Sequence, residues 1–268
     1  MMNPGEIETY ESSYKKFKKC IDNAVKISEA SGDIQCNFNV GFSHNLYTKL
    51  LMNCIGIFRL CPNQNDDFWD FFSISTLTRS LFENYATFHY MNENSNNFQQ
   101  EDFKFKLALY HWDCEKYAFY KELNDSQEIQ NELEEFEREL PNRAKEIENH
   151  PFFPFIPKDK KKKVLQGKSF MLKGNYEILK GIDFGNTPIP AMYRFYSNYT
   201  HSTAFSTMTI SNERGRGIRN EAEVGHITYA LEFSTLLLSK ATKDLIELLP
   251  EIQQKTDVNV INYFNDNL

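Results

Sequence analysis

The chain has 268 residues, of which 41% are hydrophobic and 15% aromatic, and its formal net charge is −7. A chain of this length and aromatic content can bury a substantial core, which argues against an intrinsically disordered protein. The negative charge argues against general nucleic-acid binding, because non-specific affinity comes mostly from Lys and Arg side chains that meet phosphates. Any contact with nucleic acid must therefore be local.

The five cysteines indicate reduced thiols. Their number is odd and no Cys-x-x-Cys pair occurs, which argues against both a disulfide framework and a zinc site. The first ten residues are polar and do not resemble a signal peptide, and no apolar run approaches the ~20 residues that a membrane span requires. We therefore expect a cytoplasmic protein without membrane association.

The histidines show neither His-x-x-x-His nor His-Glu-x-x-His spacing, and no glycine-rich phosphate loop follows a strand pattern. These absences predict that the protein uses no metal and no cofactor.

Apolar residues recur at helical spacing along the first half of the chain. The pattern predicts helices over residues 6–30, 43–60, 66–93, 101–123 and 127–149. Ser43 and Ser126 are the expected N-caps of the second and fifth helices, because a serine hydroxyl can accept from the free N–H groups of a first turn. The third helix is apolar on most sides, which is typical of a central helix.

The second half of the chain is less regular. Three prolines and three aromatic residues over 151–157 predict an extended segment pinned to the body of the protein. Residues 158–190 read as an irregular crossover with short helices near 158–165 and 176–179. Further helices are predicted over 191–202, 204–210 and 221–249.

These patterns predict an all-α protein: a multi-helix bundle with long antiparallel helices and an irregular crossover before the helix at 191–202. We expect one domain over 1–268, with a core at roughly 43–249, an N-terminal helix within 1–30 and a loose tail over 250–268.

The most informative stretch is the helix that carries Arg194 and His201. Seven steps of about 100° bring these two residues to one face, within ~20° of each other. Ser197 and Asn198 lie between them on the same stripe. Arginine supplies a permanent forked charge that suits phosphate, and histidine can move a proton near neutral pH. Such a pair can bind a phosphodiester and carry out acid–base chemistry beside it without a metal.

A second stretch places Arg79 and Glu83 four residues apart in the apolar helix predicted at 66–93. An exposed ion pair at this spacing contributes only about 0.2–0.5 kcal/mol. In a helix this apolar we expect at least one of the two to be partly buried and to require partners. Arg194 and His201 are the expected partners of Glu83.

The Arg-x6-His spacing in an all-helical chain resembles the HEPN superfamily, many of whose members are metal-independent ribonucleases of toxins and anti-phage systems. The Arg79/Glu83 stretch also resembles the Arg-x-x-x-Glu helix of an uncharacterised bacterial family, related to HEPN proteins, that carries Tyr-Arg-x-x-Ser-x-x-x-His. The two motifs lie within roughly residues 66–240. HEPN nucleases usually have a polar residue directly after the motif arginine, whereas this chain has Phe195.

The resemblance implies an endoribonuclease in which His201 acts as general base or acid and Arg194 neutralises the phosphate. Glu83 and Arg79 would orient them as further members of the catalytic set. It also implies a homodimer with a shared cleft, RNA as substrate, and a role as a toxin or anti-phage effector with an antitoxin or defence protein as partner.

Other residues have two open interpretations. Ser197, Asn198 and Tyr193 could contact a phosphate, a ribose or a base, or they could serve the helix and the core. The basic residues of the loop after the motif could hold an RNA backbone or could simply be solvated, namely Arg214, Arg216 and Arg219.

The alternative to an enzyme is a non-catalytic helical binding protein. It would use Arg194, His201, Arg79 and Glu83 as a buried polar network or to hold a phosphorylated ligand. Phe195 and the acidic net charge favour this alternative.

Overall fold

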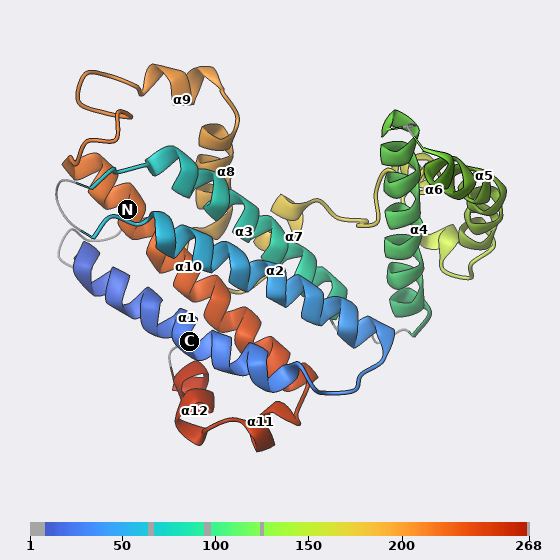
Figure 1. Cartoon of the computed structure of the whole chain (residues 1–268), viewed down its shortest axis with the longest axis horizontal. Helices are drawn as coiled ribbons and strands as arrows, with labels where there is room; N and C mark the ends of the chain where they lie inside the picture. Colours follow the sequence, from blue (N-terminus) through green and yellow to red (C-terminus); the bar gives the residue numbers. More distant parts are fainter. Residues whose placement is uncertain (1–8, 64–66, 94–97, 124–125, 267–268) are drawn as a thin grey trace. The chain divides into compact units, whose positions relative to one another are not determined.

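The computed structural model describes residues 9–63, 67–93, 98–123 and 126–266, which form twelve α-helices and one 3₁₀ turn (Figure 1). The predicted all-α bundle is confirmed. Residues 6–8 and 66, with which two predicted helices begin, lie outside the described ranges. None of the helices described combines the length and apolarity that a membrane crossing requires.

The chain divides into two compact units. Unit 1 comprises residues 1–89 and 175–268, and unit 2 comprises residues 90–174. One domain over residues 1–268 stays a prediction.

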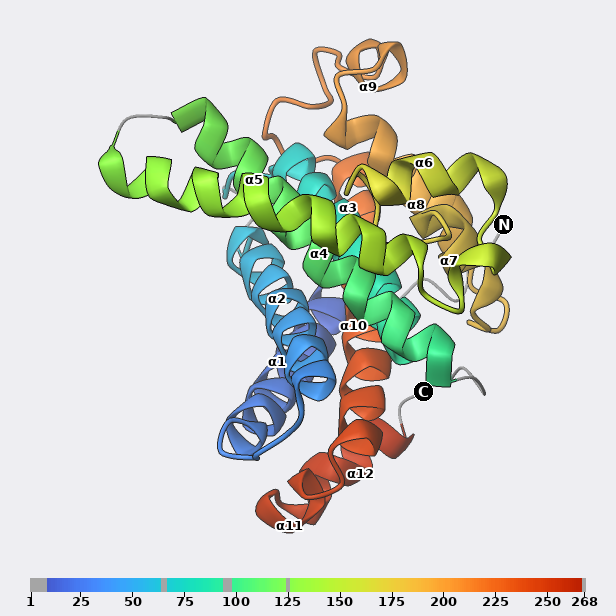
Figure 2. The ribbon, with the colours of Figure 1, turned by 90° about the vertical axis from the view of Figure 1, so that its right-hand side faces the viewer.

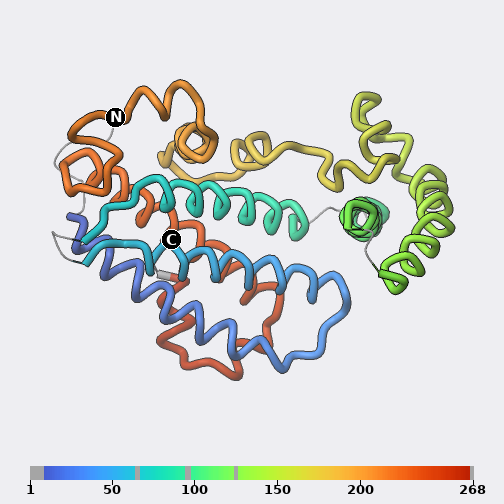
Figure 3. Tube along the Cα trace, turned by 45° about the horizontal axis from the view of Figure 1, so that its top comes forward, coloured from blue at the N-terminus to red at the C-terminus, as the bar shows by residue number. Residues whose placement is uncertain are grey.

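Unit 1 is built around the longest helix, α10 (Glu221–Leu248), which packs along α1 (Tyr10–Ser31) and α2 (Phe38–Leu60) (Figure 3). The sequence of α10 is apolar on most sides, as a helix surrounded by others must be. The remaining helices of unit 1 are α3 (Phe71–Asn92, whose last three residues are assigned to unit 2), α7 (Asn175–Gly181), α8 (Ile189–Thr200), α9 (Ala204–Met208), α11 (Ile252–Lys255) and α12 (Val258–Asp266).

Two details of unit 1 differ from the sequence-based expectation. Helix α2 begins five residues earlier than predicted and is capped by Asn37, whose side chain accepts from the N–H of Val40 at 3.0 Å. Ser43, the predicted cap, is buried inside the helix and donates to the carbonyl of Asn39 at 3.1 Å. Residues 267–268 of the predicted loose tail lie outside the described ranges, and the described part is packed, because Ile252 and Phe264 are both 0% exposed.

Unit 2 contains α4 (Phe98–Leu123), α5 (Gln127–Glu148), a 3₁₀ turn (Phe153–Phe155) and α6 (Lys158–Leu165), with α4 and α5 packed against each other (Figure 2). Ser126 caps α5 as predicted, accepting from the N–H of Ile129 at 3.3 Å. The segment at 151–157, predicted as extended, makes the 3₁₀ turn and buries Phe153. The core of this unit also includes Phe103, Leu107, Tyr110, Ile147, Ile156 and Val164.

Candidate functional site

Helix α8 carries the Arg194/His201 motif and begins with a proline in its first turn, where the missing N–H costs nothing. The helix ends at Thr200, one residue before His201, the last residue of the motif. His201 is its C-cap, with φ −97° and ψ 135°, and its N–H still donates to the carbonyl of Ser197 at 3.2 Å. The backbone therefore follows the helical path as far as His201 and leaves it there.

The two sides of α8 have different surroundings. Ile189, Tyr196 and Tyr199 are buried, whereas Arg194 and His201 are exposed. At about 100° per residue, His201 lies about 20° from Arg194 and about 40° from Ser197 around the helix. The two motif residues thus share an exposed stripe next to the side on which Ser197 lies.

The packing of Phe195 explains why the residue after the motif arginine is apolar in this chain. Its ring packs 6.1 Å from that of Phe71, 4.9 Å from that of Tyr199 and 5.1 Å from the imidazole of His226, measured between ring centroids. This position of α8 faces the aromatic core of unit 1 and has no access to the exposed stripe.

Helix α3 reaches α8 through Arg79. The Nε of Arg79 donates to the Oγ of Ser197 at 2.5 Å, and the Oγ of Ser197 in turn donates to the carbonyl of Tyr193 at 2.7 Å. The guanidinium also lies 4.0 Å from the ring centroid of Tyr193, a cation–π contact. The predicted apposition of the helix at 66–93 and the motif helix is confirmed by these contacts.

The partners of Glu83 differ from those expected. Its carboxylate lies 2.6 Å from Arg79 Nη1 and accepts from the side-chain amide of Asn175, on α7, at 3.0 Å. The expectation that Glu83 pairs with Arg194 or His201 is therefore corrected. The reason is that Arg79, four residues before Glu83 on the same helix, pairs with the carboxylate and itself contacts Ser197 of α8.

Tyr193 belongs to this network. Burial raises the pKa of its hydroxyl, the nearby carboxylate of Glu83 adds to this, and the guanidinium of Arg79 opposes it. The phenol therefore stays neutral at physiological pH. Its ring covers Arg79, which makes Tyr193 part of the packing between α3 and α8.

Arg194 and His201 have no such role. In the described part of the chain, neither side chain makes a hydrogen bond or an ion pair with another residue. Between them, the amide of Asn198 donates to the carbonyl of Arg194 at 3.0 Å, which ties it to its own helix. The stripe thus presents a guanidinium and an imidazole to solvent.

The loop of three arginines after α9 is fixed to the bundle. The carboxylate of Glu223 is 1% exposed and accepts from Arg214 Nε and Nη2 at 3.3 Å and from the N–H of Gly215 at 2.7 Å. Arg214 is therefore neutralised internally. Arg216 donates from Nε to the carbonyl of Ser211 at 2.7 Å and is exposed.

Arg219, the third arginine of this loop, lies over Trp69. Its guanidinium carbon is 5.6 Å from the centroid of the Trp69 ring. The bridge between Trp69 and Gly217 holds the same part of the loop, with the N–H of Trp69 donating to the carbonyl of Gly217 at 3.0 Å. Of the three arginines, Arg216 and Arg219 are exposed, and Arg219 is held against an aromatic ring.

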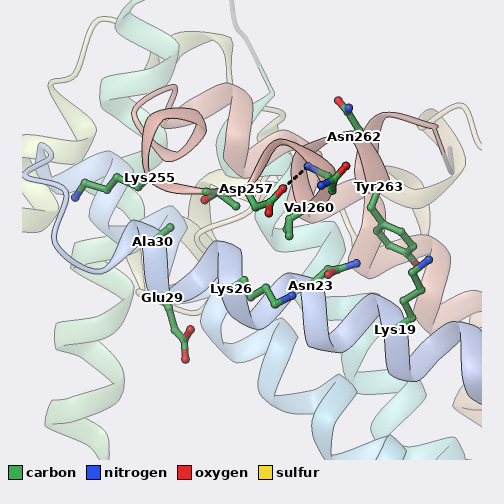
Figure 4. Close-up of a pocket in the computed structure, with 12 residues that line it drawn as sticks. Lys19, Asn23, Lys26, Glu29, Ala30, Lys255, Asp257, Val260, Asn262 and Tyr263 are labelled. Carbon is green, nitrogen blue, oxygen red and sulfur yellow. Dashed lines mark hydrogen bonds between the residues drawn. The ribbon is translucent and has the colours of Figure 1, made fainter.

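Unit 1 also has an open groove of about 880 Å³ between α1 and the α11–α12 segment (Figure 4). Its lining includes Lys19, Lys26 and Lys255, but also Glu29 and Asp257. The groove carries charges of both signs, so its composition does not favour one class of ligand.

Residues 41–217, well over half of the chain, match the model of a protein family of unknown function, DUF5677. The chain belongs to this family. The matched range contains both motif pairs and all of unit 2, and it ends two residues before Arg219. Neither a curated protein nor a solved structure matches the chain.

Sequence reasoning missed two residues of this region. Asn175 is 92 positions from Glu83, in the irregular crossover, where the apolar spacing predicts only short helices. Glu223 sits in the first turn of α10, where an acidic residue is expected for its favourable interaction with the helix dipole alone. Only the fold shows that each is a partner of a predicted site residue.

Proposed function

We propose that the protein is a metal-independent endoribonuclease whose reacting groups are His201 and Arg194. The observation that supports this is the exposure of both side chains on one stripe of α8, without internal partners, while Arg79 and Arg214 nearby are satisfied within the fold. An exposed guanidinium and imidazole on one stripe can meet a phosphate and a ribose hydroxyl together.

In the proposed reaction, His201 removes the proton from a ribose 2′-hydroxyl, whose oxygen attacks the adjacent phosphorus. The 5′-oxygen of the next nucleotide leaves and takes up a proton, and the product ends in a 2′,3′-cyclic phosphate. Arg194 stabilises the negative charge that builds on the phosphate in the transition state. No metal takes part in these steps.

Arg79 and Glu83 act in this proposal as positioning residues. Through Ser197 and Tyr193 they fix α8 against α3, and so hold the exposed stripe in one orientation. Their effect on cleavage passes through the placement of the helix, since their own polar atoms are engaged with each other and with Ser197 and Asn175.

A homodimer is part of the proposal, and exposed apolar side chains beside the stripe support it. Met208 of α9 is 84% exposed, and Phe205 and Ile210 are also exposed. Helix α9 packs next to α8 (Figure 1). Two copies that meet through this surface would bring two stripes together. Met208→Glu would then lower both the dimer fraction, measured by sedimentation velocity, and cleavage.

The test of catalysis uses purified full-length protein, structured and single-stranded RNA, and EDTA. Cleavage with cyclic phosphate ends is expected, and Arg194→Ala and His201→Ala should each lose it. Arg59→Ala, which removes an exposed arginine from α2, is the matched control and should cleave as the parent does. Equal cleavage by the parent and the two motif variants would refute the assignment.

A cytoplasmic location and a role as a toxin or anti-phage effector, with an antitoxin or defence protein as partner, belong to the same proposal. They follow from the resemblance of the two motifs to HEPN proteins. Expression in a bacterial host tests this role: growth arrest that His201→Ala relieves supports it, and normal growth at matched protein levels contradicts it.

The second candidate is a non-catalytic binding protein that holds a phosphorylated ligand on the same stripe. The pairing of Glu83 with Arg79 and Asn175 favours it, because Glu83 is then not free to orient the imidazole of His201. Under this alternative, the parent protein binds a phosphorylated ligand, the Arg194→Ala variant loses this binding, and neither protein cleaves RNA.

A further inference from the structure

A small pocket lies at the start of α1, apart from the motif stripe. It has a volume of about 200 Å³. Three aromatic side chains line it, Tyr10, Tyr14 and Trp69, together with Lys15, Arg219 and Glu11. All six belong to unit 1, and Arg219 enters from the loop that precedes α10.

The aromatic wall of this pocket is held in place by the fold. Trp69 is 3% exposed and forms its floor, and its ring centroid lies 5.1 Å from that of Tyr10. The hydroxyl of Tyr10 donates to the carbonyl of Pro62 at 2.6 Å. Tyr14 packs on Phe58 with ring centroids 4.8 Å apart and stays half-buried. The rings are thus preorganised, so a ligand would order few side chains on binding.

The two cations of the pocket are available to a ligand. Within the described chain neither Lys15 nor Arg219 forms an ion pair, and both side chains are exposed. Arg219 is held over the face of Trp69, 5.6 Å from the ring centroid. Glu11 is the single carboxylate in the lining, so the pocket has a positive balance of one charge.

Size and chemistry together define the ligand. The volume is below the roughly 300–1,000 Å³ of sites that enclose drug-sized molecules, so the pocket encloses one planar group, and the rest of a ligand lies outside it against the exposed Lys15 and Arg219. Aromatic side chains bind nucleobases by stacking, and Arg and Lys bind phosphate. A bare anion would make no stacking contact with the aromatic rings. A neutral aromatic compound would leave Lys15 and Arg219 without a partner of opposite charge.

We propose that this pocket binds a nucleoside monophosphate group, with the base on the accessible part of Tyr14, beside Trp69, and the phosphate on Arg219 and Lys15. The group could be a free nucleotide or one nucleotide of an RNA chain, since both offer the same base and phosphate. The site shares no residue with the Arg194/His201 stripe and goes beyond the cleavage proposed there.

The test uses the two tryptophans of the chain. Trp112 is 62% exposed and lies in unit 2, so Trp112→Phe leaves Trp69 as the single indole without disturbing the pocket. In this background, UMP and AMP should change the fluorescence of Trp69 in a saturable way. Calorimetry on the unsubstituted protein should give the same affinity.

The variants separate stacking from charge. Tyr14→Ala and Tyr14→Leu should weaken nucleotide binding about 5- to 100-fold, and Tyr14→Phe should keep it. Arg219→Ala should weaken the binding of UMP but not that of uridine. Arg216→Ala, which removes an exposed arginine of the same loop that does not line the pocket, is the matched control and should bind as the parent does. Circular dichroism verifies that each variant is folded.

Several results would overturn the assignment: no saturable response to either nucleotide, unchanged affinity in both Tyr14→Ala and Tyr14→Leu, or displacement of UMP by inorganic phosphate at equal concentration. Competition by a short RNA identifies a nucleotide within RNA as a ligand, and its absence identifies the free nucleotide. His201→Ala should bind UMP normally, so failure of the proposed cleavage and failure of this pocket are distinguishable.

Discussion

Arg79 Nε donates a hydrogen bond to Ser197 Oγ over 2.5 Å, which joins α3 to α8 across 118 positions of sequence. The same guanidinium pairs with Glu83 and covers Tyr193. A single side chain therefore supplies a hydrogen bond and a cation–π contact between α3 and α8.

Replacement of Arg79 by alanine should lower the free energy of unfolding by about 2–3 kcal/mol, because the charged hydrogen bond to Ser197 and the contact with Tyr193 are lost together. Urea denaturation measures the change. Arg59→Ala removes an exposed arginine of α2 and should alter stability by less than about 0.5 kcal/mol. A similar small effect for Arg79→Ala would show that the network contributes little.

Arg194→Ala and His201→Ala should keep the melting temperature within about 2 °C of the parent, because both side chains are exposed and make no internal polar contact in the described chain. Differential scanning calorimetry is the measurement. A large drop for His201→Ala would instead indicate the buried network of the binding-protein hypothesis.

Glu223→Gln should destabilise the protein by roughly 1.5–3 kcal/mol and loosen the loop at 214–219, because a buried carboxylate that holds Arg214 and the N–H of Gly215 becomes neutral. Hydrogen exchange at Gly215 should accelerate. Glu221→Gln, an exposed change in the same helical turn, is the control and should leave both quantities as they are.

Asp244 should make the protein less stable as pH rises, which is the opposite of the usual effect of an aspartate. Burial raises the pKa of its carboxyl from 3.8 to about 6, in spite of Lys240 and Lys243. The folded state therefore binds more protons than the unfolded state between these values, and stability falls as pH rises from about 4 to 6.

Asp244→Asn removes this cost. The variant should be more stable than the parent by roughly 1–3 kcal/mol at pH 8 and close to it at pH 4. Urea denaturation at the two pH values provides the comparison, with the exposed Glu251→Gln as control. An identical difference at both pH values would exclude the carboxyl of Asp244 as its source.

The cysteines should react unequally with a thiol reagent at pH 8. Burial raises the pKa of Cys20 to about 11 and that of Cys61 to about 12, and it raises the pKa of Cys54 well above its usual value. Cys36, by contrast, is exposed. Because the thiolate is the reactive form, Cys36 should be modified first in the folded protein, and the three buried thiols only in denaturant. Mass spectrometry of modified peptides assigns the sites, and early labelling of Cys54 would contradict the packing of α2.

The sequence by itself determined the helical architecture, because helix periodicity and capping are local properties. The apolar spacing of α10 and the serine before α5 are enough to place those helices to within a residue or two. The 700° rotation between Arg194 and His201 is likewise a local property of α8.

Tertiary structure alone decided the partners that lie on other elements of the chain. Asn175 donates to Glu83, Arg214 pairs with Glu223, and Arg219 lies over Trp69. Long-range partners follow from how helices pack, and packing depends on the sum of many weak apolar contacts that no short motif encodes. For this reason the motif residues could be named from the sequence, whereas the division between buried supports and the exposed Arg194/His201 stripe could be seen only in the folded chain.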